Sequence, residues 1–160
     1  MKDLYGIYVR VSTDDQHSKQ LIGGCKSLSK ILNVNVRTFD DFNVSSKIPI
    51  HNRPEGSKLM KDLASGKLKG LIVPKWDRIT RVLKDSIEFL EFYDKHNFKL
   101  YSVYEGEYDG SPNKEYIFKQ LCLISEYELK QLKWRSQIGI ERAKQEGKYN
   151  GRQKGSKNKI

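Results

Sequence analysis

The 160-residue sequence has few of the residues that common enzyme chemistries require. Its two cysteines, Cys25 and Cys122, lie far apart without metal-ligand spacing, which predicts two buried, reduced thiols. Its three histidines, His17, His51 and His96, form no triad-like pattern, and no Gly-x-Ser-x-Gly elbow is present. Acyl transfer by a serine hydrolase is therefore disfavoured.

Other absences narrow the class of function further. No cluster of carboxylates suits a two-metal nuclease, and the Walker phosphate-binding pattern is missing, so nucleotide hydrolysis has no support. No apolar run is long enough to span a membrane, and the first residues do not begin a signal peptide. We expect a cytoplasmic protein with no membrane partner, no metal and no small-molecule cofactor.

Positive charge is what the sequence has in excess. Thirty Lys and Arg against 20 Asp and Glu give a net charge of +10. This charge favours a polyanionic partner, and nucleic acid is the leading candidate. A basic protein with no nucleic-acid role is the alternative. From residue 142 to the end, Glu146 is the only acid among seven basic residues: Arg142, Lys144, Lys148, Arg152, Lys154, Lys157 and Lys159.

The apolar pattern predicts an α/β fold with a mostly parallel central sheet flanked by helices, because strand-like and helical segments alternate along the chain. The expected strands are 4–9, 34–39, 68–76 and 98–104. One helix is expected to begin near residue 14, and further helices are expected to cover 54–66, 85–96 and about 114–146.

The remaining segments are predicted to be irregular. Residues 40–53 have no clear period and are expected to form a mobile loop, and 105–113 a polar loop. Residues 1–146 are expected to form one domain that includes the long helix. Residues 147–160, poor in apolar side chains, are expected to be a basic flexible arm or linker.

Two polar motifs stand directly after predicted strands. Arg10 and Ser12 follow the first strand, and Asp77, Arg78 and Arg81 follow the third. Ligands of such sheets bind at the carboxyl ends of strands, and guanidinium groups offer paired donors to phosphate. The motifs together predict a phosphate-processing site with Ser12 as an oxygen nucleophile. A helix cap is the alternative for Ser12, and surface charge is the alternative for the arginines.

Several segments, in order along the chain, carry a family resemblance. They are Tyr8 to Gln16, Arg53-Pro54, Trp76 to Arg81, the region of Glu128, and Gly147 to Arg152. Together they resemble the N-terminal catalytic domain of serine recombinases of the resolvase/invertase family. Two features depart from that pattern: Leu129 stands where many members have an arginine, and Ser45-Ser46 replaces the usual Ser-Gly.

The resemblance implies a site-specific DNA recombinase, which is a DNA strand transferase. Ser12 would attack a DNA phosphodiester and become joined to the 5′-phosphate, and the freed 3′-hydroxyl would later rejoin a different strand without ATP or metal. The catalytic residues it implies are Ser12, Arg10, Gln16, Arg53, Asp77, Arg78 and Arg81. The alternatives are a recombinase-like module that dimerises and binds DNA without cutting it and, with less support, another phosphate-ester hydrolase.

The resemblance also implies double-stranded DNA, a homodimer and, in the synaptic complex, a tetramer as partners, with a prokaryotic, phage or mobile-element origin. The apolar first half of the long helix would form the dimer interface, although it could instead pack on its own sheet. The interface residues would be Ile117, Phe118, Leu121 and Ile124. The DNA-binding residues would be Arg135, Arg142, Lys144, Lys148, Arg152, Lys154 and Lys157.

Overall fold

The computed structural model describes residues 2–11 and 15–148, without the side chains of residues 15–17. The chain divides into two compact units, Met1–Glu126 and Tyr127–Ile160, so the division falls inside the long C-terminal helix. Each unit is described by itself.

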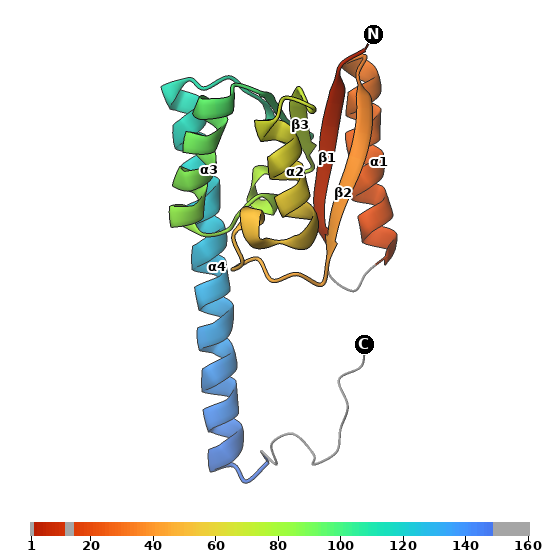
Figure 1. Ribbon diagram of the computed structural model, residues 1–160. Coiled ribbons are helices and arrows are strands. Elements are labelled where there is room, and N and C mark those ends of the chain that lie inside the picture. Colours follow the sequence, from red (N-terminus) through yellow and green to blue (C-terminus); the bar gives the residue numbers. More distant parts are fainter. Residues whose placement is uncertain (1, 12–14, 149–160) are drawn as a thin grey trace. The chain divides into compact units, whose positions relative to one another are not determined.

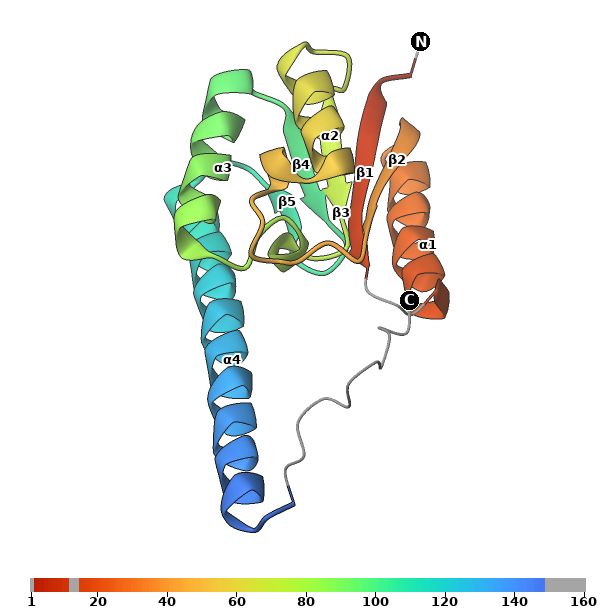
Figure 2. The same ribbon diagram turned by 60° about the horizontal axis from the view of Figure 1, so that its bottom comes forward.

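The first unit is built on a five-stranded sheet with the order β2-β1-β3-β4-β5 (Figures 1 and 2). Four strands are parallel, and β5 runs antiparallel to β4 at one edge. The strands are β1 Leu4–Val11, β2 Asn35–Phe42, β3 Gly70–Val73, β4 Lys99–Ser102 and β5 Gly106–Tyr108. The predicted α/β fold with a mostly parallel sheet is confirmed.

β1 lies between β2 and β3, and its side chains alternate between two apolar layers. Its residues pair in parallel with β2 from Leu4 opposite Asn35 to Val11 opposite Phe42. Tyr5, Ile7, Val9 and Val11 face α1 (Asp15–Ile31), where they pack with Cys25. Tyr8 points to the opposite layer with Phe39. This period of two explains why the short apolar run forms a strand buried on both faces.

Three helices cover the face of the sheet opposite α1. They are α2 (Pro54–Ala64), α3 (Leu83–His96) and the first turns of α4 (Pro112–Gln145), and Figure 1 shows α1 alone on the other side. Leu59 from α2, Phe89 from α3 and Phe118 from α4 join one buried cluster beneath them. Pro54 occupies the first turn of α2, where its missing N–H has no cost.

The loops differ from the prediction in two places. The polar loop expected at 105–113 contains β5, whose Tyr108 packs edge-on against Trp76 with ring centroids 5.9 Å apart. β5 has only three residues, too few for a periodic signal. The loop expected at 40–53 begins with the end of β2 and contains the short 3-10 turn η1 (Ile50–Asn52).

The first turns of α4 correct part of the predicted dimer interface. Phe118 is 0% exposed inside the core of its own unit, so it is wrong as an interface residue. Ile117 and Leu121 are partly buried against the same core, whereas Ile124 is 51% exposed. Apolar side chains occur around the helix, and only some of them face the sheet. Cys25 and Cys122 are buried and unpaired, as predicted.

The second unit contains the rest of α4. It ends as predicted at Gly147, whose positive φ of 67° lets its N–H turn back to the carbonyl of Lys144. Within this unit Leu132, Trp134 and Ile138 are exposed apolar side chains. Every helix in the described part of the chain is too short or too polar to cross a lipid bilayer.

Candidate active site

β1 and β3 end at the same edge of the sheet and deliver the two predicted motifs there. Arg10, the second-last residue of β1, lies opposite Asp41 of β2 and donates from Nη1 to the carbonyl of Val44 at 3.2 Å. Ser12 follows β1 directly but lies outside the described residues. Gln16 belongs to α1, and its side chain also lies outside the description.

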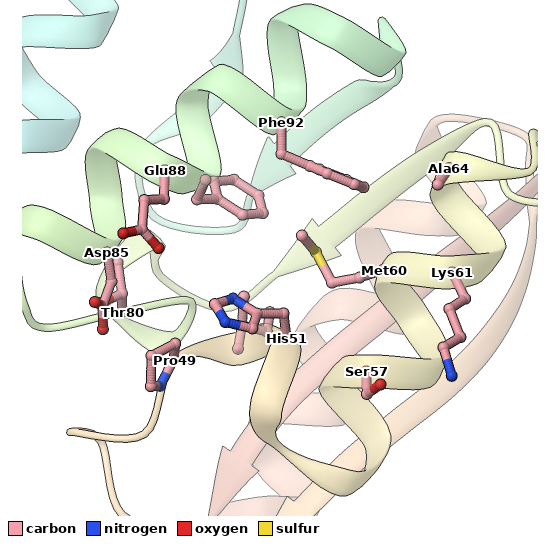
Figure 3. A pocket seen from close by; sticks show the side chains of 12 residues that line it. Pro49, His51, Ser57, Met60, Lys61, Ala64, Thr80, Asp85, Glu88 and Phe92 are labelled. Atoms are coloured by element: carbon pink, nitrogen blue, oxygen red, sulfur yellow. The ribbon is translucent and has the colours of Figure 1, made fainter.

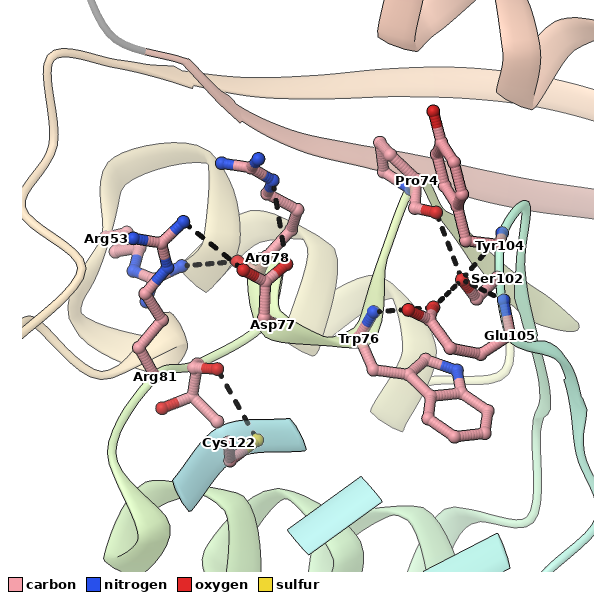
Figure 4. A network of polar contacts seen from close by, with 11 residues as sticks. Arg53, Pro74, Trp76, Asp77, Arg78, Arg81, Ser102, Tyr104, Glu105 and Cys122 are labelled. Atoms are coloured by element: carbon pink, nitrogen blue, oxygen red, sulfur yellow. Dashed lines mark hydrogen bonds and ion pairs between the residues drawn. The ribbon is translucent and has the colours of Figure 1, made fainter. Parts of the chain in front are cut away.

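The second motif lies on a short turn after β3. Trp76, Asp77 and Arg78 form the 3-10 turn η2 (Trp76–Arg78), and Figure 4 shows both motif arginines beside the Asp77 carboxylate. Arg81 Nη2 lies 3.2 Å from Asp77 Oδ2, and Arg78 Nε lies 3.7 Å from Oδ1. Asp77 therefore holds the two guanidinium groups near each other. The Trp76 side chain is fully buried in the core.

Arg53 is buried, although it ends the segment that the sequence predicts to be a mobile loop. Its side chain is 0% exposed, and Nε donates to the carbonyl of Ile48 at 2.8 Å. Nη1 donates to the hydroxyl of Tyr8 at 2.9 Å and to the carbonyl of Arg78 at 3.2 Å. Arg53 therefore supports the backbone of η2 from inside the protein.

Tyr8 and Asp41 complete this buried network, although neither is a predicted site residue. The Tyr8 hydroxyl donates to Asp41 Oδ2 at 2.9 Å. Asp41 also accepts hydrogen bonds at 2.9 Å from the backbone N–H groups of Glu55 and Gly56, in the first turn of α2. Burial, as the largest cause, raises the pKa of Tyr8 above its ordinary value. The hydroxyl therefore stays protonated as the donor to Asp41.

The arginine cluster, defined as Arg10, Arg53, Arg78 and Arg81, has donors without partners. Arg10 Nε, Arg53 Nη2, Arg78 Nε and Arg81 Nε are all buried and lack hydrogen-bond acceptors. Burial first, and then the charges of Arg81, Arg53 and Arg78, lowers the pKa of Arg10 to about 10. Among the described residues, these four cations lie near the carboxylate of Asp77, and an anion would satisfy their open donors and relieve the repulsion.

A cavity lies apart from the arginine cluster. It has a volume of about 390 Å³ between α2 and α3, and Figure 3 shows Met60 and Phe92 facing it from opposite helices. Its lining includes Asp85 and Glu88 but no member of the arginine cluster. We place the candidate active site at the arginine cluster rather than in this cavity, because the cluster has the unpaired donors that an anion needs. Among the described residues, no three His, Cys, Asp or Glu side chains are grouped so as to hold a metal ion.

Comparison with known proteins identifies the family. Residues 5–149 match the family model of the resolvase N-terminal domain. The chain belongs to the resolvase family. A protein of Bacillus subtilis (strain 168) named "Putative DNA recombinase" is 30% identical over 141 residues, which cover 85% of this chain and 27% of that protein. This resolvase-family chain thus spans about a quarter of that relative's length.

Solved structures confirm the resolvase-family fold. The N-terminal catalytic domain of TP901-1 integrase has a TM-score of 0.61 and 22% identity, covering 81% of this chain and 98% of that one. A resolvase family site-specific recombinase from Streptococcus pneumoniae has a TM-score of 0.59 and 19% identity, covering 88% and 99%. At these identities the likeness supports the fold alone.

The predicted DNA-binding residues lie in the second unit. Those within the description are exposed on the last turns of α4 or directly after it: Arg135, Arg142, Lys144 and Lys148. Arg142 Nε and Lys148 Nζ both contact the carboxylate of Glu146, at 3.0 and 2.9 Å. Arg152, Lys154 and Lys157 lie outside the described residues.

Proposed function

We propose that this chain is the catalytic domain of a site-specific DNA recombinase in which Ser12 becomes covalently joined to DNA. One observation above all supports the proposal. The arginine cluster presents buried donors without partners at the sheet edge where β1 ends, and Ser12 is the second residue after Arg10. A nucleophile next to an anion-binding group of this kind suits attack on a phosphodiester.

The proposed reaction is a reversible exchange of ester bonds. The Ser12 oxygen attacks phosphorus and gives its proton to a base, while the bond from phosphorus to the 3′-oxygen breaks and that oxygen takes a proton. The product is a 5′-phosphoserine and a free 3′-hydroxyl. Rejoining reverses these steps with a different 3′-hydroxyl, so the phosphoserine conserves the energy of the broken bond. No ATP, metal or cofactor enters the scheme.

The arginine cluster supplies the electrostatic part of this mechanism. Negative charge grows on the phosphate oxygens during attack, and fixed guanidinium groups stabilise it. We assign Arg10, Arg78 and Arg81 to the phosphate because their side chains are partly exposed. Arg53 supports η2 from behind, and Asp77 orients the two motif arginines. Gln16 is proposed to shape the same site.

The proposed partner is double-stranded DNA, bound by a homodimer that becomes a tetramer in the synaptic complex. The interface would use the outer side of the first half of α4, including Ile117, Leu121 and Ile124. Residues 1–146 would form the catalytic domain, and residues 147–160 a basic arm. DNA phosphates would be bound by Arg135, Arg142, Lys144, Lys148, Arg152, Lys154 and Lys157. The cytoplasm of a prokaryotic cell carrying a phage or mobile element is the proposed setting.

A trapping experiment tests the proposal. The chain is incubated with nicked duplexes of randomised sequence, so that the short 3′-hydroxyl fragment is lost after cleavage. We expect a covalent protein–DNA adduct that mass spectrometry locates on Ser12, that is absent in Ser12→Ala, and that is retained in Ser27→Ala, a control on the exposed side of α1. DNA binding by a dimer or tetramer without any adduct would instead indicate a binding module.

A further inference from the structure

A second polar network adjoins the arginine cluster at the end of β4. We call it the Ser102–Glu105 clamp, and it consists of those two side chains. The Ser102 oxygen lies 3.0 Å from the carbonyl oxygen of Pro74 and accepts from the N–H groups of Tyr104 and Glu105 at 3.3 Å. It also contacts the Glu105 carboxylate, and Glu105 Oε2 accepts from the N–H of Trp76 at 3.2 Å. Figure 4 shows the clamp beside η2.

The clamp provides an acceptor for a backbone N–H group that has no hydrogen-bond partner within η2, that of Trp76. The first N–H groups of a helical turn have no partner within the turn. Lys75, the residue before η2, makes no side-chain capping bond. Glu105, in the turn between β4 and β5, supplies the acceptor instead. The clamp therefore caps η2 with a residue that follows it by 29 positions in the sequence.

η2 is consequently held at both ends by side chains from other elements. Glu105 binds the N–H of Trp76 at its start, and Arg53 binds the carbonyl of Arg78 at its end. Between these two points stands Asp77, which pairs with Arg78 and Arg81. Cations held this close repel one another, so the backbone that carries Arg78 and Arg81 needs support from outside η2.

We propose that Ser102 and Glu105 are positioning residues that set the direction in which η2 presents Arg78 and Arg81 to the scissile phosphate. The reaction named here is the proposed one, but anion binding by the cluster does not depend on it. Misplacement of a catalytic group by about 1 Å is enough to reduce a rate by about 100-fold. Loss of the clamp should therefore weaken catalysis without removing any group that touches DNA.

Two substitutions separate positioning from simple stability. Glu105→Ala removes the acceptor for the Trp76 N–H, whereas Glu105→Gln keeps an acceptor oxygen of the same shape. We expect Glu105→Ala to slow adduct formation with nicked DNA by at least about 10-fold at saturating protein. DNA affinity should change less than about 2-fold, because phosphate contacts elsewhere supply most of it. Glu105→Gln should restore the rate to within about 3-fold of the parent.

Glu107→Ala is the matched control, since Glu107 is an exposed carboxylate on β5 that contacts Lys99 and Tyr101 rather than η2. It should behave like the parent. An unchanged rate in Glu105→Ala, or equal loss in Glu105→Ala and Glu105→Gln, would overturn the proposal.

A measurement that needs no cleavage keeps the test independent of the recombinase assignment. Inorganic phosphate is titrated into the isotopically labelled chain, and the arginine Nε–H signals are followed by NMR. We expect Glu105→Gln and Glu107→Ala to bind phosphate like the parent, and Ser102→Ala to bind it about 3- to 10-fold more weakly, a loss typical of one hydrogen bond. Should Glu105→Ala fail to fold, Ser102→Ala decides the matter, and parent-like phosphate affinity in that variant would count against positioning.

Discussion

The arginine cluster and the Ser102–Glu105 clamp lie next to each other at one edge of the sheet, yet they differ in whether their buried polar groups have hydrogen-bond partners. In the clamp, the Ser102 oxygen and the Glu105 carboxylate both have hydrogen-bond partners, and the backbone N–H of Trp76 has an acceptor. In the arginine cluster, every member has at least one buried donor without an acceptor. Unpaired buried donors are costly, whereas paired ones stabilise the fold. The difference assigns ligand binding to the cluster and support to the clamp.

The sharpest test of this comparison is Arg78→Ala. Its guanidinium stands among like charges, and Asp77 keeps Arg81 as a closer partner, so removal of Arg78 should cost the fold little. Adduct formation should fall by about 100- to 1,000-fold, as for the loss of one transition-state donor. Adduct yield and urea denaturation measure the two effects. Arg37→Ala, at an exposed arginine paired with Asp62, is the control. Cleavage at the parental rate in Arg78→Ala would show that the site is misplaced.

Arg53→Ala should behave in the opposite way. Arg53 is buried and donates to Ile48, Tyr8 and Arg78, so its loss leaves three acceptors without that donor. We expect the free energy of unfolding to fall by at least about 3 kcal/mol, because each of these buried acceptors left without a donor costs about 1–3 kcal/mol. Urea denaturation of Arg53→Ala beside Arg78→Ala measures the contrast. Equal stability of these two variants would remove the distinction between supporting and binding arginines.

An added anion should stabilise the cluster directly. Inorganic phosphate at ten times its dissociation constant should raise the free energy of unfolding by about 1.4 kcal/mol, because it binds only the folded chain. Sodium chloride at the same ionic strength is the control, and thermal denaturation is the measurement. The increase should vanish in Arg81→Ala and persist in Arg37→Ala. A similar increase in both variants would place phosphate outside the cluster.

The smallest expected effect concerns Arg10 and pH. Since burial and neighbouring cations lower the pKa of Arg10 in the folded chain to about 10, below the ordinary 12.5, the folded state carries the cost of a partly buried cation at every pH below 10. Between pH 10 and 12.5 the folded state releases this proton first, so the cost declines. Arg10→Met should therefore be slightly more stable than the parent at pH 7, with an advantage that shrinks above pH 10. Urea denaturation at pH 7 and above pH 10 measures the difference in free energy of unfolding between Arg10→Met and the parent. A less stable variant at pH 7 would argue against repulsion at this site.

The motif arginines could be predicted from the sequence because their placement follows from local rules. Arg10 follows an apolar strand, as do Arg78 and Arg81, and parallel strands bring their carboxyl ends to one edge. The burial of Arg53 could not be predicted in this way. Its acceptor Tyr8 is 45 positions away, and Asp41 lies 33 positions from Tyr8. Such pairings exist only after the sheet has formed.

Part of α4 was mispredicted for a related reason. The apolar residues from Ile117 to Ile124 occur around the helix, so their pattern does not say which of them face the protein's own core. Phe118 faces the core, where its ring packs against that of Trp76 with centroids 5.5 Å apart. Ile124 remains on the outer surface.

The position of β1 between β2 and β3 has a consequence for amide hydrogen exchange. Backbone groups of a strand flanked on both sides open only when large cooperative parts of a domain unfold. Arg10 is carried by such a strand, whereas Arg53 follows the short turn η1 outside the sheet. We therefore expect the amides of Gly6 and Ile7, where β1 pairs with both neighbouring strands, to exchange at the rate of global unfolding, and those of η1 to exchange earlier. Arg10 is thus tied to the slowest-opening part of the protein, and adjustments to a bound ligand fall to the turns around it.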